Sequence, residues 1–250
     1  MVDYYEMLFK RKSFHLFRGT GVISPDERKE LEARIKAVRP LDESIRTEIQ
    51  ILPECETTCS RGAQYCILFY SEPVGNYLRN IGYMGEQIDL YLAAKDIGSL
   101  WFGIGRPKQD APAGMEFVIM MAIAKMSSSQ FRRDMFKVKR KPISEMWKGT
   151  PLPFADIVRF APSACNTQPW IVEREDNTLW IYQYKKPGKR GIMPADKVRF
   201  YNKIDIGIFL FFLEVCLEHD GYKFTDEQYT EHAADDEERI LTAKYSIFVK

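Results

Sequence analysis

The segment Ala161–Trp170, APSACNTQPW, is the part of the sequence that decides the fold. It combines two prolines with small polar side chains, so its backbone is stiff and its hydroxyl and amide groups point in fixed directions. Such a segment suits the binding of a flat heterocycle that donates and accepts hydrogen bonds. Three of its residues are therefore candidate ligand-binding residues: Ser163, Asn166 and Gln168.

Two further segments suit a bound cofactor. Arg11-Lys12-Ser13 places two cations and a hydroxyl within three residues, which fits a phosphate monoester that requires charge-assisted donors. Gly98–Gly105, GSLWFGIG, has little side-chain bulk at Gly103 and Gly105, so backbone amides there can approach a ring edge closely. The same stretch lacks the third glycine of a dinucleotide-binding fingerprint and gives little support to that fold.

Composition excludes several classes of protein. The chain has 250 residues, 45% of them hydrophobic, which is ample for a packed core and excludes disordered and fibrous proteins. Its 36 basic and 35 acidic residues leave a net charge of +1, so no global field attracts nucleic acid or an anionic membrane. Neither a signal peptide nor an apolar run approaching the ~20 residues of a membrane span is found. We expect a cytoplasmic protein that acts on a small molecule.

The cysteines indicate neither disulfides nor a metal site. Five is an odd number, and a chain with this much apolar material does not need disulfides, so we expect reduced thiols. Cys55 and Cys59 are spaced as metal ligands can be. With only three histidines and no second cysteine pair at ligand spacing, however, the sequence predicts no metal.

Helices and short strands alternate along the chain. Apolar periodicity predicts helices over 3–10, 24–38, 83–97, 151–160 and 204–219, and strands over 66–70, 117–124, 170–173, 179–184 and 245–249. Ser24-Pro25-Asp26-Glu27 is a helix-capping sequence. Gly98 and Gly221 are expected to end helices. The basic stretch Lys185–Lys197 is expected to be a charged surface loop.

The same order of elements occurs twice, at a nearly constant offset. Matching points are Val38-Arg39-Pro40 with Phe160-Ala161-Pro162 at 122 residues, Gly98 with Gly221 at 123, and Arg11-Lys12 with Arg140-Lys141 at 129. Loop insertions account for the drift. The sequence therefore predicts an α+β chain built from two diverged half-units, 1–135 and 136–250. Because identity between the halves is low, a chance recurrence of generic patterns is the alternative.

Three of these segments resemble motifs of the FMN-dependent nitroreductases. APSACNTQPW is similar to the family's A-P-S-x-x-N-x-Q-P-W at seven positions. RKSFHLF, Arg11–Phe17, resembles the opening R-R-S-x-R-x-F, and Gly85–Gly105 is similar to the helix and turn whose amides face the flavin ring. The resemblance implies a nitroreductase-like α+β fold with bound FMN. It also implies an oxidoreductase that passes electrons from NAD(P)H to a nitroaromatic or quinone-like acceptor by a ping-pong mechanism, with the chemistry on the flavin and no catalytic side chain.

The resemblance also implies roles for particular residues. Arg11, Lys12 and Ser13 are assigned to the phosphate and ribityl end, and the amides of Gly103 and Ile104 to the N5 side of the ring. Arg140 and Lys141, in the basic run Lys137–Lys141, resemble the residues that complete the phosphate pocket. Pro162, Ser163, Asn166 and, less directly, Gln168 are assigned to the flavin from the other half.

His15 departs from the family pattern, which has a third arginine at this position. A histidine titrates near neutrality, so phosphate binding would be weaker or pH-dependent. Alternatively, Arg18 or the run Lys137–Lys141 compensates and His15 is a packed neutral imidazole.

The order of the motifs departs from the family as well. In family chains the A-P-S segment follows the first motif by a few tens of residues, and two chains pair around each flavin. Here the complete segment lies in the second half, and the first half has only Val38–Asp42 in its place. The resemblance thus implies a fused pseudo-dimer with one FMN, as a monomer or weak homodimer. Two alternatives stay open: a protein of this fold that binds flavin or a small molecule without turnover, and an interaction module without cofactor.

Overall fold

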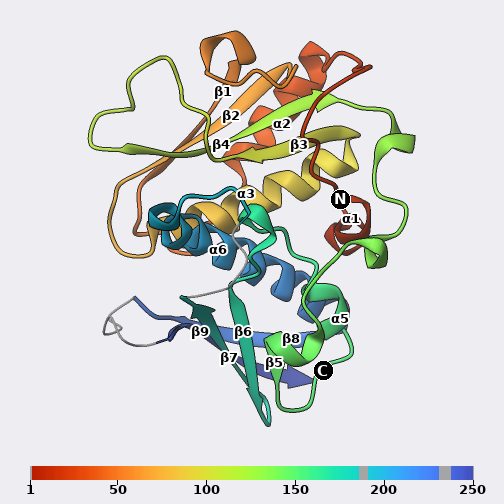
Figure 1. The fold of residues 1–250 in the computed structure, drawn as a ribbon, viewed down its shortest axis with the longest axis vertical. Helices are drawn as coiled ribbons and strands as arrows, with labels where there is room; N and C mark the ends of the chain where they lie inside the picture. The colour runs from red at the N-terminus through yellow and green to blue at the C-terminus, as the bar shows by residue number, and fades with distance from the viewer. Residues whose placement is uncertain (1, 186–190, 231–237, 250) are drawn as a thin grey trace. The chain divides into compact units, whose positions relative to one another are not determined.

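The computed structural model describes residues 2–185, 191–230 and 238–249 (Figure 1). The chain divides into two compact units, Met1–Met135 and Phe136–Lys250. Each unit combines one sheet with helices, so the predicted α+β class is confirmed.

The first unit contains a four-stranded antiparallel sheet with strand order β1-β2-β4-β3. Its strands are β1 Thr47–Pro53, β2 Tyr65–Ser71, β3 Ile97–Phe102 and β4 Glu116–Lys125, and its helices are α1 Tyr4–Lys10, α2 Pro25–Lys36 and α3 Tyr77–Ala94. The central strands β2 and β4 are almost entirely buried, as their aliphatic, aromatic and methionine side chains require. Helix α3 lies against β2 and β3.

The second unit contains a five-stranded sheet with strand order β5-β6-β7-β9-β8. Its strands are β5 Trp147–Lys148, β6 Trp170–Glu175, β7 Thr178–Tyr184, β8 Tyr222–Gln228 and β9 Arg239–Val249, and its helices are α4 Ile143–Met146, α5 Ala155–Val158 and α6 Ala195–His219. Strand β5 runs parallel to β6, and the other pairs are antiparallel. Helix α6 lies against β7, β8 and α5.

The two sheets share one topology once β5 is set aside. The orders β1-β2-β4-β3 and β6-β7-β9-β8 correspond strand by strand, and the long helix follows the second strand in both. Each sheet also carries a β-bulge at the corresponding place. Val118 of β4 is the extra residue opposite Phe69 and Tyr70, and Thr242 of β9 is the extra residue opposite Ile181 and Tyr182.

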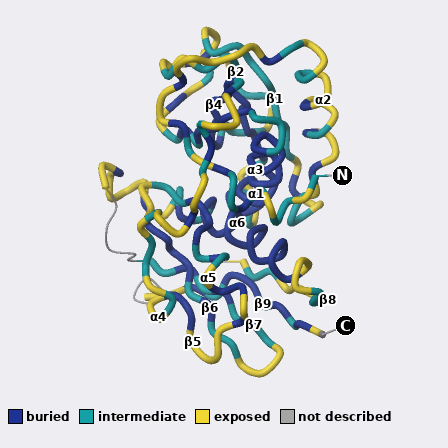
Figure 2. Tube along the Cα trace, turned by 90° about the vertical axis from the view of Figure 1, so that its right-hand side faces the viewer, coloured by how far each residue is buried: buried dark blue, intermediate teal, exposed yellow. Residues whose placement is uncertain are grey.

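The long helices α3 and α6 are buried around their whole circumference. Every residue from Leu78 to Ala93, and every residue from Ile204 to Leu217, is buried (Figure 2). A helix that is buried on every side is usually apolar on every side. Both nevertheless contain buried polar residues, which require partners: Asn80, Glu86, Gln87 and Asp89 in α3, and Asn202, Asp205 and Glu214 in α6.

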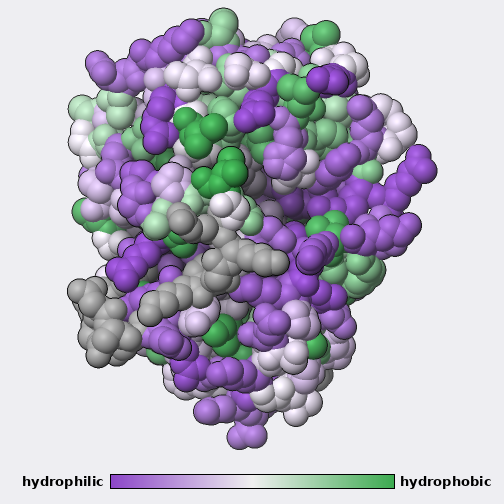
Figure 3. Space-filling model, viewed as in Figure 1, coloured by the Kyte–Doolittle hydropathy of each residue, from purple (hydrophilic) through white to green (hydrophobic). Residues whose placement is uncertain are grey.

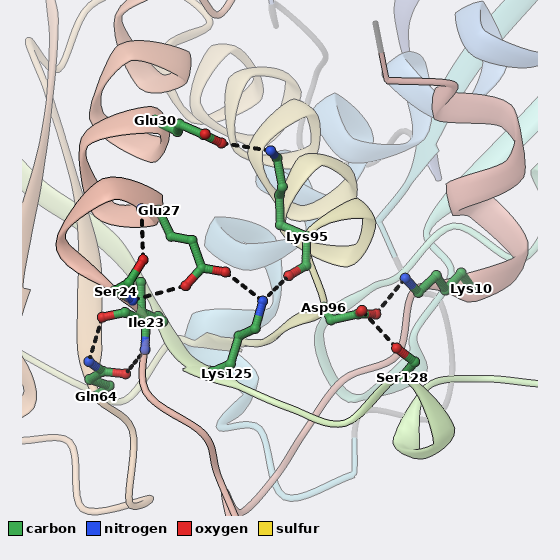
Figure 4. Close-up of polar contacts among 10 residues, drawn as sticks. All are labelled: Lys10, Ile23, Ser24, Glu27, Glu30, Gln64, Lys95, Asp96, Lys125 and Ser128. Carbon is green, nitrogen blue, oxygen red and sulfur yellow. Dashed lines mark hydrogen bonds and ion pairs between the residues drawn. The ribbon is translucent and has the colours of Figure 1, made fainter.

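The end of α3 differs from the prediction. The helix ends at Ala94, Asp96 takes a left-handed φ of 53°, and Gly98 is a residue of β3, so the prediction that Gly98 ends the helix is wrong. The Asp96 carboxylate accepts hydrogen bonds from Lys10 Nζ and Ser128 Oγ, each at 2.7 Å (Figure 4). These bonds hold a non-glycine residue where glycine is usual.

The predicted start of α2 is confirmed in detail. Ser24 Oγ accepts from the amide of Glu27 at 3.2 Å, and Glu27 Oε2 accepts from the amide of Ser24 at 2.9 Å, which forms a capping box. The other carboxylate oxygen of Glu27 accepts from Lys125 Nζ at 2.6 Å, and Lys125 Nζ also donates to the carbonyl of Lys95 at 2.7 Å (Figure 4). This network ties β4 to α2 and to the end of α3.

Other predicted elements are confirmed with shifted bounds or are wrong. Helices α1, α3 and α6 and strands β2, β4, β6, β7 and β9 are confirmed, although α3 and α6 begin several residues earlier than predicted. The predicted helix over 151–160 is wrong apart from Ala155–Val158. Strands β1, β3, β5 and β8 were not predicted. All four lie at sheet edges. Strands β1 and β8 alternate with polar residues, β5 has only two residues, and β3 is mostly buried but is interrupted by glycine and serine.

Among the described residues, no helix is both long enough and apolar enough to cross a bilayer. Figure 3 shows hydrophilic side chains spread over the visible face, with hydrophobic residues in small groups between them. Residues 186–190, part of the predicted charged loop Lys185–Lys197, lie outside the described residues.

Candidate functional site

The segment Ala161–Trp170 connects α5 to β6 and has an unusual backbone. Cys165, Asn166 and Gln168 have φ values of 49°, 57° and 48°. Of the five non-glycine residues with positive φ in the described part of the chain, three lie in this segment. Each left-handed residue of this kind costs ~1–2 kcal/mol, so the surrounding structure must hold the loop in place.

Polar residues of α6 hold the loop Ala161–Trp170 in place. The amide of Ala164 donates to Asp205 Oδ1 at 2.9 Å. The Thr167 hydroxyl donates to Asn202 Oδ1 at 2.9 Å and lies 3.5 Å from Asp205 Oδ2. Burial raises the pKa of Asp205 to about 8, against the opposing effect of the bonds from Ala164 and Thr167. The Asp205 carboxyl is therefore mainly neutral at pH 7.

Bonds within the loop fix its polar groups. Ser163 Oγ accepts from the amide of Gln168 at 3.0 Å, and the Gln168 side chain donates to the carbonyl of Asn166 at 3.1 Å. At the end of the loop the Trp170 ring stacks on Phe209 of α6, with centroids 4.9 Å apart. Cys165 and Asn166 are exposed at the tip.

Two predicted cations lie beside this loop. Arg140 donates to Asn166 Oδ1 at 2.8 Å and to the carbonyl of Phe160 at 3.2 Å. Lys141 donates from its amide to Gln168 Oε1 at 2.8 Å and from Nζ to the Gln168 carbonyl at 3.1 Å. Burial lowers the pKa of Lys141. The structure thus brings together all six candidate residues of the second unit: Arg140, Lys141, Pro162, Ser163, Asn166 and Gln168.

Arg11 in the first unit is already paired. Its side chain is 2% exposed, and Nε donates to Asp89 Oδ2 at 2.9 Å while Nη2 donates to Ser13 Oγ at 3.2 Å. Nε also lies 3.8 Å from Glu86 Oε1. Burial and the Asp89 carboxylate raise the pKa of Glu86 well above its ordinary value, which favours its neutral form. Asp89 therefore balances the Arg11 charge, and a phosphate would have to compete with this carboxylate.

Asp89 also connects Arg11 to β3. The Ser99 hydroxyl donates to Asp89 Oδ1, and the Trp101 indole donates to Oδ2 at 3.1 Å. Ser13 forms an isolated parallel bridge with Ser99, in which the amide of Phe14 donates to the Ser99 carbonyl at 2.9 Å. Arg11 and Ser13 thereby fasten the N-terminal segment to the sheet.

Lys12 is the exposed member of the motif. Its Nζ donates to the carbonyl of Gln130 at 3.0 Å and lies 5.0 Å from the centre of the Phe14 ring. Arg132, a residue that the sequence did not single out, lies beside the same segment, because its amide donates to the Lys10 carbonyl at 3.1 Å. Burial, together with the neighbouring Arg11, lowers the pKa of Arg132 to about 10.

His15 and the Gly103–Gly105 turn are both at the surface. The His15 side chain is exposed, so the interpretation of a packed neutral imidazole is wrong. The amide of Gly105 donates to the Phe102 carbonyl at 3.3 Å, which places Gly103 and Ile104 at the centre of a turn. Ile104 is 71% exposed, and Arg106 donates to the carbonyl of Gly103 at 2.9 Å.

Sequence reasoning missed three residues that organise these segments: Asp89, Asn202 and Asp205. A signal for them exists, because each is a polar residue inside an otherwise apolar helix and each must find a buried partner. The described cysteines are all free, and no group of three or more potential metal-ligating side chains occurs among the described residues.

Comparison with known proteins identifies the family of the chain. Residues 3–216 match the family model described as "Putative TM nitroreductase". A putative nitroreductase from Thermotoga maritima has a similar structure, with a TM-score of 0.63, 19% identity, and coverage of 98% of this chain and 94% of that one.

Two more distant structures are nitroreductases that contain FMN. The one from Desulfitobacterium hafniense has a TM-score of 0.40 and 14% identity, covering 57% of this chain and 100% of that one. The one from Desulfovibrio desulfuricans has a TM-score of 0.45 and 17% identity, covering 61% and 99%. No curated protein matches. The family match extends over most of the chain, and the chain therefore belongs to the nitroreductase family described as "Putative TM nitroreductase".

Proposed function

We propose that the chain binds FMN and passes electrons from NAD(P)H to a small oxidised acceptor, such as a nitroaromatic or a quinone, by a ping-pong mechanism. Family membership supports this proposal. The observation that carries it is the loop Ala161–Trp170, which is strained, internally bonded and exposed at its tip. Backbone strain of this kind clusters at ligand sites, where it fixes the direction of binding groups in advance.

The side chains around the loop fit the chemistry of FMN. The guanidinium of Arg140 and the ammonium of Lys141 are charge-assisted donors suited to a phosphate monoester. Asn166, exposed at the tip, carries both donor and acceptor atoms, as the edge of a flavin ring requires, whereas Gln168 is buried and its side chain already bonds Lys141 and Asn166. When bound, the flavin supplies the hydride-transfer chemistry. These side chains would hold and orient it, and none of them is required to react.

The first unit's contribution to binding is a separate part of the proposal. Because Asp89 already neutralises Arg11, Lys12 is the member of the Arg11-Lys12-Ser13 motif best able to bind an added anion. Replacing Lys12 with alanine should weaken FMN binding several-fold at low salt, and less at high salt, because an exposed charge is screened. If Lys12→Ala bound FMN as tightly as the wild type at both salt concentrations, Lys12 would not be a binding residue.

FMN binding is tested first by the visible absorption spectrum of the purified protein and by titration with FMN. Asn166→Ala should raise the FMN dissociation constant about tenfold, the effect of losing roughly 1.4 kcal/mol of hydrogen bonding. Asn177→Ala, in the exposed turn between β6 and β7, is the matched control and should bind as the wild type does. A colourless protein that takes up no FMN would contradict the proposal.

Turnover is tested separately. Under anaerobic conditions, NADH or NADPH should bleach the flavin absorption, and an added nitroaromatic or quinone should restore it. A yellow protein that neither nucleotide bleaches would favour the alternative of a flavin-binding protein without turnover.

We also propose that the two units arose by duplication and that the chain binds one FMN. The shared strand order and the two bulges, at Val118 and Thr242, support the duplication. The absence of an A-P-S segment from the first half supports the single site. A stoichiometry of two FMN per chain would contradict it.

A further inference from the structure

A buried polar residue occupies the same place in each long helix. Asn80 lies 14 residues before the last residue of α3, and Asp205 lies 14 residues before the last residue of α6. Asn80 Oδ1 accepts from the amides of Leu41 and Asp42 at 2.7 and 3.2 Å, and Asp205 Oδ1 accepts from the amide of Ala164 at 2.9 Å. Both residues therefore hold the backbone of a preceding segment against the helix.

The two segments differ in their backbone. Val38–Asp42, held by Asn80, contains no residue with positive φ. Asp205 instead contacts both sides of a left-handed pair: Ala164 precedes Cys165 and Asn166, and Thr167 follows them. Its two oxygens are placed to hold the ends of this turn.

The hydrogen bonds form a directed chain when the Asp205 carboxyl is neutral. Oδ1 accepts from the Ala164 amide at 2.9 Å, and the Thr167 hydroxyl donates to Asn202 Oδ1 at 2.9 Å and lies 3.5 Å from Asp205 Oδ2, so a proton on Oδ2 would complete the chain. A carboxylate would offer two acceptors, so the Thr167 proton would have to serve both Asp205 and Asn202. Burial is the largest cause of the raised pKa of Asp205, and the hydrogen bonds from Ala164 and Thr167 oppose it.

We propose that Asp205 is the positioning residue of the flavin-binding loop, and that its two carboxyl oxygens hold Cys165 and Asn166 in the left-handed conformation that aims the loop at its ligand. This inference rests on the proposed flavin site for its functional consequence. Its structural content, a loop fixed by Asp205, does not depend on flavin.

The experiment combines three variants with two measurements. Asp205→Asn keeps an acceptor for Ala164 and a donor for Thr167, so it reproduces the neutral acid. Asp205→Ala removes both. Asn80→Ala, the matched control, removes the corresponding contact of the first unit. The FMN dissociation constant is measured between about pH 6.5 and about pH 9.5, and amide hydrogen exchange of the peptide that contains Ala164–Thr167 is followed in flavin-free protein.

The expected results are specific to each variant. Asp205→Ala should weaken FMN binding about tenfold or more and speed exchange of the loop. Asp205→Asn should bind within about threefold of the wild type below pH 8 and should lack the wild type's loss of affinity above that pH. Asn80→Ala should leave affinity unchanged.

Other results would overturn the inference. They are unchanged loop exchange in Asp205→Ala, or an Asp205→Asn variant whose pH profile parallels that of the wild type. The second result decides the matter even where Asp205→Ala does not fold. A wild type that binds no flavin but whose loop exchanges faster in Asp205→Ala would refute the proposed function and leave the positioning role intact.

Discussion

Replacing Asp205 with asparagine should make the stability of the protein, as well as its ligand binding, less sensitive to pH. The Asp205 carboxyl is fully buried, and its pKa is raised from an ordinary value of 3.8 to about 8. Between these two values the folded state holds a proton that the unfolded state has released. Stability contributed by this group is therefore greatest at low pH, falls as the pH rises toward about 8, and is constant above it.

The magnitude follows from the number of protons involved. One proton retained only by the folded state changes the free energy of unfolding by about 1.4 kcal/mol per pH unit. Asp205→Asn lacks the titrating group, so the variant should gain about 2 kcal/mol on the wild type between pH ~6 and pH ~7.5. Other groups with raised pKa values, such as Glu86, are present in both proteins and cancel in the difference.

Urea denaturation followed by tryptophan fluorescence at a series of pH values measures this difference. Asn80→Asp is the reciprocal control, because it places a carboxyl at the corresponding position of α3 and should make the first unit lose stability as the pH rises. A difference between Asp205→Asn and wild type that stays constant within about 0.5 kcal/mol over this range would refute the reasoning. It would mean that Asp205 is ionised at neutral pH in spite of its burial.

Two further predictions concern the first unit, and urea denaturation tests both. Gly98→Ala should cost about 1–3 kcal/mol, because an added Cβ would lie 2.6 Å from Met126 Cγ; a loss below about 0.5 kcal/mol would show that Met126 moves aside. Asp89→Ala should cost about 3–5 kcal/mol, because it removes the carboxylate that lies 2.9 Å from the buried Arg11 and accepts from Ser99 and Trp101, whereas Glu32→Ala, in an exposed pair, should cost no more than about 0.5 kcal/mol. Equal losses in these two variants would show that Arg11 reaches water.

Local signals in the sequence were sufficient for the parts of the fold that local bonds determine. The start of α2 was predictable, because Ser24 and Glu27 cap each other across three residues. The end of α3 was not, because Asp96 takes the left-handed position with the help of Lys10 and Ser128, which are distant in sequence. Gly98 has a different purpose: it makes room for the Met126 and Phe14 side chains.

The candidate site likewise has a part that its local sequence predicts and a part that depends on residues distant in the sequence. The motif Ala161–Trp170 identified the loop, since its composition alone indicates a stiff, polar segment. The role of Arg11 was harder to predict, because Asp89, 78 residues later, occupies the guanidinium that the motif assigns to a phosphate. A motif names the side chains that are able to bind a ligand, and only the packing decides which of them already have a partner.

The buried polar residues of the long helices carry information that neither motif contains. Asp89 and Glu214 are 125 residues apart, as Asn80 and Asp205 are, and each accepts hydrogen bonds from its own sheet: Asp89 from Ser99 and Trp101, Glu214 from Tyr245 at 2.8 Å. Two buried polar positions of α3 and α6 therefore match even though the A-P-S segment is present in only one half, whereas Glu86 and Gln87 correspond to Phe211 and Phe212.

The match has a physical reason. A polar side chain inside an apolar helix is costly without a partner, and Asn80, Asp89, Asp205 and Glu214 each have one in the backbone or in a strand. Ligand-binding side chains at a loop tip face no such constraint, because water satisfies them when the ligand is gone. Positions such as Asn80 and Asp205 therefore indicate the common architecture of the two halves. The first half has a carboxamide at this position, and the second half, whose loop is strained, has a carboxyl.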